Sequence, residues 1–113
     1  MKHDNDLFIT KLNDAIGIES VVKELGLIAK YGLVEGNGYY LGQCIYGHGS
    51  ANGQCFRINT KGNYYNCFHC KKAGNVVSLV MHEKKLDFKQ AARWLVEQFA
   101  PHLEADLKKN NLE

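Results

Sequence analysis

Two short segments decide the fold of this chain: Cys44-Ile45-Tyr46-Gly47-His48 and Cys67-Phe68-His69-Cys70. Each segment follows a predicted strand, and the residues between them form mostly a predicted hairpin. Two such pairs of metal-ligating residues bridged by a hairpin are typical of a tetrahedral zinc site with three sulfur atoms and one nitrogen. The sequence therefore predicts one zinc ion bound by Cys44, His48, Cys67 and Cys70.

The remaining cysteine leaves a second ligand set open. Cys55 lies in a predicted strand, away from any tight turn, and we expect it to be a small, half-buried side chain. A four-thiolate site, as in iron–sulfur proteins, would require Cys55 in place of His48. A redox C-x-x-C motif expects a strand-to-helix βαβ setting, which this pattern lacks. With all four positions filled by protein, the predicted zinc is structural and leaves no place for a catalytic water.

Length and composition indicate an ordinary small globular chain. It has 113 residues, 45% of them hydrophobic and 23% charged, which suits a single domain spanning 1–113. No apolar run is long enough to span a membrane, and the polar N-terminus does not resemble a secretory signal. We therefore expect a cytoplasmic location without membrane contact, where cysteines serve as metal ligands or thiols rather than disulfides.

Acidic residues are absent from one long stretch of the chain. All 12 Asp and Glu residues lie at or before Glu35, or at or after Glu83, although the net charge is only +2. The stretch from 36 to 82 contains four bases: Arg57, Lys61, Lys71 and Lys72. Three thiolates around a zinc ion add about one negative charge, which leaves the stretch positive by about three. This balance favours a nucleic-acid partner, although four bases are few for such a patch.

Periodicity separates the chain into a helical, a strand-rich and a second helical zone. Residues 6–26 read as helix, interrupted near Gly17, with an apolar stripe that ends at Gly26. The middle zone predicts strands over 27–33, 38–43, 54–59 and 63–67. Residues 60–62 form the predicted hairpin turn between the last two strands.

The last zone predicts two helices. The first covers 75–83, and the second begins after Asp87, which forms a capping box with Gln90, and ends before Pro101. Residues 14–99 form the expected core, and 102–113 are expected to be a tail with at most a weak helical turn. The predicted fold class is α+β: a zinc ribbon with a small antiparallel β-sheet flanked by helices.

The order of these motifs resembles the Cys-His-Cys-Cys zinc-binding domain of bacterial and phage DNA primases. The resemblance covers about residues 14–99. Its matching segments are Tyr39-Tyr40-Leu41-Gly42-Gln43-Cys44, Cys55-Phe56-Arg57-Ile58, Asn66-Cys67-Phe68-His69-Cys70, Lys72-Ala73-Gly74-Asn75 and Phe88-Lys89-Gln90-Ala91-Ala92. The family's Cys-Pro-Phe-His is replaced by residues 44–48, with one extra residue and no proline, which indicates a divergent member.

The resemblance implies a DNA-binding module of a primase or of a primase-like replication protein. Such a module contacts single-stranded template during primer initiation and works with a primase catalytic core, a helicase or a polymerase. The clustered carboxylates that hold magnesium in primase catalysis are not supplied here, so the chain alone is expected not to be an enzyme. Both a fragment of a larger primase and a stand-alone relative fit the sequence.

Basic and aromatic side chains are the expected contacts with single-stranded DNA. Phosphates attract bases, and exposed aromatic rings stack on nucleotide bases. The expected nucleic-acid-binding residues are Arg57, Lys61, Tyr65, His69, Lys71 and Lys72. The alternative interpretation is a zinc-ribbon adaptor that binds a replication protein, and an exposed apolar helix face would favour it.

Overall fold

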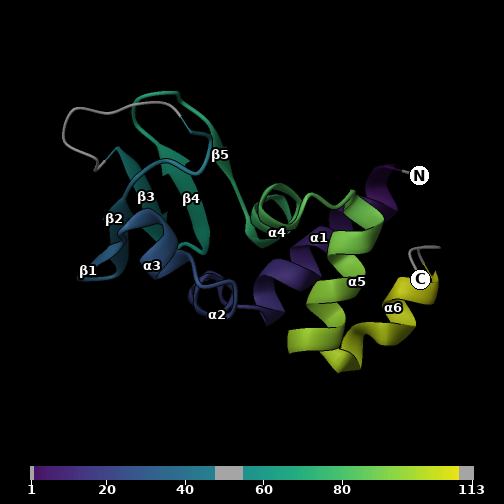
Figure 1. The fold of residues 1–113 in the computed structure, drawn as a ribbon. Coiled ribbons are helices and arrows are strands. Elements are labelled where there is room, and N and C mark those ends of the chain that lie inside the picture. The colour runs from purple at the N-terminus through teal and green to yellow at the C-terminus, as the bar shows by residue number, and fades with distance from the viewer. Residues whose placement is uncertain (1, 48–54, 110–113) are drawn as a thin grey trace. The chain divides into compact units, whose positions relative to one another are not determined.

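The computed structural model describes residues 2–47 and 55–109, which form two compact units. The ribbon unit is the continuous segment Ile18–Asn75, and the helical unit combines Met1–Gly17 with Val76–Glu113. Figure 1 shows strands and short helices in the first unit and only helices in the second. Each unit has its own buried apolar residues.

The ribbon unit is built on one five-stranded antiparallel sheet. Its strands follow one another in the order β1-β2-β3-β4-β5, so every strand pairs with its neighbour in sequence (Figure 1). The central hairpin pairs Ile58 with Tyr65. The bounds of the strands are Val34–Gly36, Tyr39–Gly42, Phe56–Asn59, Tyr64–Cys67 and Ala73–Gly74. The predicted strands over 38–43, 54–59 and 63–67 are confirmed in their described parts, whereas β1 and β5 were not predicted.

One face of this sheet is buried, because side chains alternate between the two faces of a strand. Phe56, Ile58 and Tyr65 are fully buried on this face. Helix α2 (Ile18–Glu24) belongs to the same unit and buries Ile18, Val21 and Val22. The backbone N–H of Ile18 donates a 2.6 Å hydrogen bond to Asn63 Oδ1 in the β3–β4 turn, which ties the start of α2 to the hairpin.

The segment after α2 corrects the prediction of a strand over 27–33. Residues Leu27–Tyr31 form the short helix α3, between Gly26 and Gly32, whose φ angles are 69° and 62°. Both angles lie in the left-handed region, which glycine adopts without steric penalty. The N–H groups of Gly32 and Leu33 both donate to the carbonyl of Ile28 and so close the helix end. The glycines at both ends of this segment therefore favour a short helix over a strand.

The helical unit contains the helices expected at both ends of the chain. Helix α1 covers Lys2–Ala15, α4 covers Val76–Lys84 and α5 covers Phe88–Phe99. The predicted capping box is confirmed: Asp87 Oδ1 accepts from Gln90 N–H at 2.8 Å, and Gln90 Oε1 accepts from Asp87 N–H at 3.2 Å. Helix α5 ends before Pro101, as the sequence indicated, and Pro101 begins the 3₁₀ helix η1 (Pro101–Leu103).

The residues expected to form a tail are part of this unit. Helix α6 (Glu104–Lys109) buries Leu107, and η1 buries Leu103. Lys11 Nζ of α1 lies 2.9 Å from Asp106 Oδ1. Buried side chains thus extend past the expected 14–99 core at both of its ends, since Phe8 and Leu12 of α1 are also buried. Sequence periodicity indicated at most a weak helical turn here, because α6 has only six residues.

Candidate metal centre

The first sulfur-bearing turn follows β2. Cys44 lies two residues past the end of this strand, and Gly47 N–H donates to the Cys44 carbonyl at 3.3 Å. Gly47 adopts a φ of 79°, which closes the turn tightly. The backbone N–H of Tyr46 points at the sulfur and donates to Cys44 Sγ at 3.4 Å. Such N–H groups stabilise negative charge on a cysteine sulfur.

The second sulfur-bearing turn has the same construction at the end of β4. Cys67 is the last residue of the strand, and Cys70 N–H donates to Cys67 Sγ at 3.5 Å. Lys71 N–H donates to the Cys67 carbonyl at 3.0 Å, and the φ of Lys71 is 65°. The sheet edge fixes this turn, because Cys67 N–H donates to the Lys72 carbonyl at 2.8 Å.

Together the two turns bring three sulfur atoms to one point. The Sγ atoms of Cys44, Cys67 and Cys70 all lie within 4.8 Å of one another, and Cys44 Sγ is 3.8 Å from Cys70 Sγ. A tetrahedral zinc ion with Zn–S bonds of about 2.3 Å requires sulfur atoms about 3.8 Å apart. None of the three cysteines is in a disulfide. The donor set and its spacing therefore fit one zinc ion.

The Cys44 thiol depends on a cation to become a thiolate. Burial raises the pKa of the Cys44 thiol to about 12; the hydrogen bond from Tyr46 N–H opposes this rise, and the neighbouring Cys67 and Cys70 thiols add to it. Neutral thiols are poor metal ligands, and thiolates are strong ones. A divalent cation placed among the three sulfurs offsets both the burial and their mutual repulsion.

The fourth position of the predicted site is not described. His48 lies outside the described residues, so its assignment as a ligand stays a prediction. Cys55, the alternative ligand, is buried but does not belong to the sulfur group found among the described residues. Its carbonyl oxygen accepts a 2.8 Å hydrogen bond from Phe68 N–H and so supports the second turn through the backbone.

The residues expected to bind nucleic acid differ in exposure. Lys61, His69, Lys71 and Lys72 are exposed. Arg57 is half-buried, and its guanidinium carbon lies 4.4 Å from the centre of the Tyr39 ring. Tyr65 is fully buried against Phe56, with its hydroxyl 2.7 Å from the Tyr46 hydroxyl. A buried ring has no face for a base, so the expectation of stacking on Tyr65 is wrong.

Two other aromatic rings of the ribbon unit are exposed. Tyr64 is 43% exposed on β4, and Phe68 is 50% exposed at a non-ligand position of the second turn. The exposure of Tyr64 follows from the pairing of Tyr65 with the buried Ile58, which the hairpin length sets. The exposure of Phe68 could be expected from its position between Cys67 and Cys70, past the end of β4, where its side chain has no neighbouring strand to pack against.

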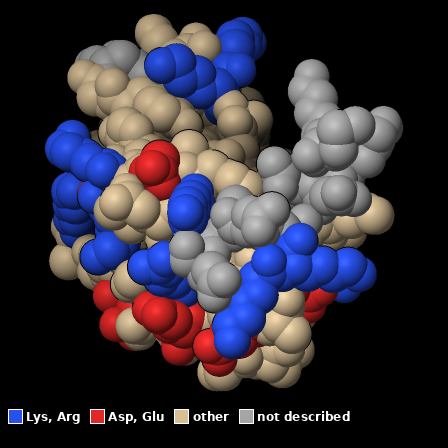
Figure 2. All heavy atoms as spheres, turned by 90° about the vertical axis from the view of Figure 1, so that its right-hand side faces the viewer, with Lys and Arg blue, Asp and Glu red and all other residues tan. Residues whose placement is uncertain are grey.

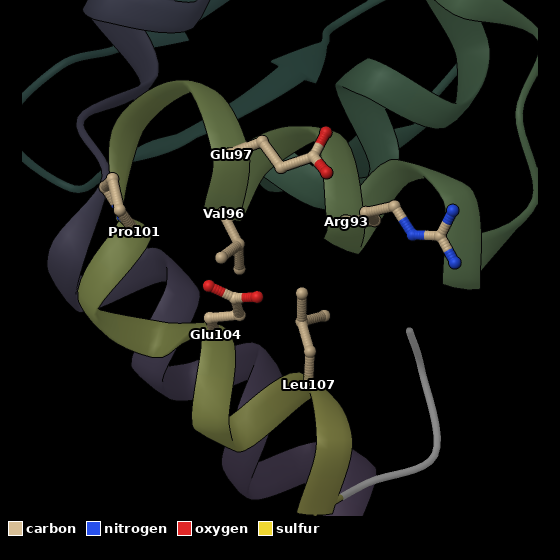
Figure 3. A pocket seen from close by; sticks show the side chains of 6 residues that line it. All are labelled: Arg93, Val96, Glu97, Pro101, Glu104 and Leu107. Carbon is tan, nitrogen blue, oxygen red and sulfur yellow. The ribbon is translucent and has the colours of Figure 1, made fainter.

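A separate hollow of about 360 Å³ lies in the helical unit. Its lining residues are Arg93, Val96, Glu97, Pro101, Glu104 and Leu107. In Figure 3 the guanidinium of Arg93 points away from the carboxylate of Glu104, so the charged groups do not converge on one point. None of the predicted site residues lines this hollow.

The antiparallel sheet and the three converging sulfurs define a zinc-ribbon protein. The family model described as the CHC2 zinc finger matches residues 4–111, so the chain belongs to this family. A DNA primase from Clostridium acetobutylicum is 30% identical over 90 residues, which cover 80% of this chain and 14% of that protein. The resemblance to primase zinc-binding domains seen in the sequence is thereby confirmed.

A solved structure shares the fold. It is the crystal structure of the Aquifex aeolicus primase, comprising zinc-binding and RNA polymerase domains, and it matches with a TM-score of 0.66 at 20% identity. The match covers 81% of this chain and 21% of that chain. The chain thus spans a small part of both relatives. Over the described residues, no helix has the length and apolar character needed to cross a membrane.

Proposed function

We propose that the chain is the zinc-binding module of a DNA primase or of a primase-like replication protein, and that it contacts single-stranded template during primer initiation. The family membership and the sulfur cluster support this assignment. We further propose that residues 1–113 act as one module. Its partners are the DNA template and a primase catalytic core, helicase or polymerase that carries out or supports synthesis.

The zinc in this proposal is structural. Cys44, Cys67 and Cys70 supply three ligands, and His48 supplies the fourth, which leaves no open coordination position for a reacting water. The module therefore contributes template binding, and the chemistry of primer synthesis belongs to another part of the protein or to a partner. Zinc holds the two turns together and so fixes the neighbouring basic side chains.

The observation that carries the DNA contact is the charge of the ribbon unit. It contains six basic and three acidic residues, and all three acidic residues lie before the zinc-binding segment. The helical unit carries eight basic and nine acidic residues. The view from the side of α5 and α6 shows Lys and Arg side chains close to Asp and Glu side chains (Figure 2). A polyanion is attracted by unbalanced positive charge, which favours the ribbon unit as the DNA-binding part.

Exposed groups around the second turn suit a single strand. Lys71 and Lys72 follow Cys70 directly, and Phe68 and His69 precede it, all with exposed side chains. Lysines neutralise phosphates, and an exposed ring stacks on a base with a gain of about 1–3 kcal/mol. Apart from Leu7, the described helices expose no large apolar side chain, so the feature that would favour the adaptor alternative is not found among them.

The test is a titration of the zinc-loaded chain with a labelled single-stranded oligonucleotide at several salt concentrations. With three or four phosphates engaged, log affinity should fall with log salt at a slope of about −2 to −3. The Lys61→Ala, Lys72→Ala double variant should bind more weakly and flatten this slope by roughly 1 to 1.5. Replacing the exposed Lys108 and Lys109 of α6 with alanine removes the same charge and serves as the matched control.

Binding that the control variant weakens as much as the ribbon variant would contradict the proposed surface. No binding at low salt would contradict the template contact itself and would favour the protein-adaptor alternative.

A further inference from the structure

The solvent-facing side of the sheet carries a polar and aromatic surface without any carboxylate. Its residues alternate with the buried ones along β2, β3 and β4. Strand pairing aligns them in two rows across the sheet. One row is Tyr39, Asn59 and Tyr64, and the other is Leu41, Arg57 and Asn66. We call these six residues the sheet surface.

Glycines fix the two tyrosine rings of this surface. A Cβ atom at Gly36 would collide with the ring of Tyr39, and one at Gly62 would collide with the ring of Tyr64. Each ring therefore lies directly over a glycine backbone. Asn59 adds a second constraint on Tyr64, because its Nδ2 donates to the Tyr64 hydroxyl at 3.1 Å while its Oδ1 accepts from Gly62 N–H at 2.7 Å. The rings are held in place before any ligand binds.

Arg57 is the charged group of the sheet surface. Its guanidinium lies on the Tyr39 ring, at 4.4 Å from the ring centre, and its buried Nε has no hydrogen-bond partner. The described residues give it no ion pair, and no Asp or Glu occurs between 36 and 82. Stacking on Tyr39 restricts the plane of the guanidinium, so its terminal N–H groups are oriented donors. Arg57 is half-buried, whereas Lys61, Lys71 and Lys72 are exposed. The exposed lysines are free to follow the phosphates of a flexible strand, and the Arg57 side chain is held in one place.

We propose that the sheet surface holds one guanine base of the single-stranded template, stacked on Tyr64 and hydrogen-bonded by Arg57. Arg57 pairs across the strands with Asn66, two residues from Tyr64 on β4. Such diagonal neighbours are about 7–8 Å apart, within reach of long side chains. Guanine presents two adjacent acceptors, O6 and N7, to a guanidinium that has donors only. This inference rests on the proposed template contact and adds base selectivity to it.

The test compares three thymidine oligonucleotides that differ at one central position: guanine, 7-deazaguanine or adenine. The zinc-loaded chain should bind the guanine oligonucleotide about tenfold more tightly than the other two, because 7-deazaguanine lacks the N7 acceptor and adenine replaces O6 with a donor. Arg57→Lys keeps the charge but loses the two-pronged donor, so it should lose the preference and keep the salt slope. The Lys61→Ala, Lys72→Ala variant should weaken all three complexes and keep the preference.

Tyr64 provides an independent arm. Tyr64→Ala should weaken binding of all three oligonucleotides about tenfold, and Tyr64→Phe, which keeps the ring, should bind as the unchanged chain does. Zinc content, measured for each variant, reports that the fold is retained.

Equal affinity for guanine and 7-deazaguanine, a preference for adenine, or a guanine preference that survives Arg57→Lys would each overturn the inference. In those cases DNA still binds and the proposed function stands. If no oligonucleotide binds at low salt, the proposed function fails first, and this inference fails with it.

Discussion

Each sulfur-bearing turn has one residue in the left-handed backbone region, a glycine in the first turn and a lysine in the second. Gly47 adopts this conformation freely, whereas Lys71, with a φ of 65°, carries a Cβ that makes it unfavourable by roughly 1–2 kcal/mol. The hydrogen bonds that Cys67 makes with Lys71 and Lys72 hold the second turn in this shape. The second turn is thus a pre-formed metal-binding loop that keeps a positive charge beside the sulfurs.

The identity of the fourth ligand gives a prediction at this scale. Cys55→Ser should retain one zinc per chain, because Cys55 is not part of the sulfur group of the described residues. His48→Ala should retain zinc only weakly, since it leaves three ligands and an open position. Zinc content after dialysis against a weak chelator measures both. The reverse order of zinc retention would assign Cys55, not His48, to the site.

A pH-dependent prediction concerns Tyr40. Its hydroxyl donates to Glu19 Oε2 at 2.7 Å, and this hydrogen bond, together with burial and the charges of Glu19 and Glu35, raises the pKa of Tyr40 to about 12. Because the pKa is raised in the folded chain, protonated Tyr40 stabilises the fold. This stabilisation is complete below the ordinary pKa of about 10 and is lost as the pH rises toward 12.

The matching variant is Tyr40→Phe. It should unfold more easily at neutral pH by roughly 1.5–3 kcal/mol, the range for a hydrogen bond to a charged group. Between about pH 10 and 12 the unchanged chain should lose more stability than the variant, as measured by urea unfolding. Parallel pH profiles of the two proteins would show that Tyr40 is not the titrating group.

At the residue scale, the sequence predicted what spacing alone determines. The two predicted ligand pairs, Cys44/His48 and Cys67/Cys70, are each set by a short turn. Their spacing was enough to assign Cys44, Cys67 and Cys70 to one cluster. Tyr64 and Tyr65 could not be assigned to the correct faces, because alternation gives opposite faces but not which is buried. That choice depends on the pairing of Tyr65 with Ile58.

Among the secondary-structure elements, local signals at the ends of helices were the most informative. Asp87 and Gln90 predicted the start of α5, and the structure has both hydrogen bonds of the box. The short helix α3 was mistaken for a strand because five residues are too few to show a helical period. Strands β1 and β5, of three and two residues, also carry too few side chains for a pattern.

The capping box gives the prediction for the elements. Asp87→Ala removes the acceptor for Gln90 N–H and should destabilise the chain by about 1 kcal/mol. Asp87→Ser keeps a capping oxygen and should be close to the unchanged chain. Urea unfolding at constant zinc measures both, and zinc content should not change because Asp87 lies in the helical unit. Equal stability of all three proteins would mean that the cap contributes nothing.

On the scale of the whole molecule, zinc links segments that are far apart in the sequence. Cys44 and Cys70 are separated by 26 positions, and their sulfurs lie 3.8 Å apart. The ribbon unit is small, and a small core needs such a link to stay folded. The sequence predicted that the fold depends on zinc. It did not predict the division into two units, because α1 and α5 are far apart in the sequence and contact each other only in the folded chain.

Removal of zinc is the corresponding prediction. The purified chain should contain about one zinc, and a strong chelator should abolish its cooperative unfolding transition, since metal binding and folding of such sites are coupled. Amide hydrogen exchange should show lost protection in β3 and β4, and added zinc, but not magnesium, should restore it. A metal-free chain that still unfolds cooperatively would contradict the structural role of zinc.

The ribbon unit is one continuous segment and the helical unit consists of two segments, and this difference has a consequence for biosynthesis. The chain leaves the ribosome from its N-terminus onward, so the ribbon unit has emerged completely while the helical unit still lacks α4 and α5. During that interval the apolar side of α1, with Phe8 and Leu12, lacks the helices that it packs with in the finished unit. The nascent chain can therefore take up zinc first, and α1 is the segment that chaperones would need to shield in the meantime.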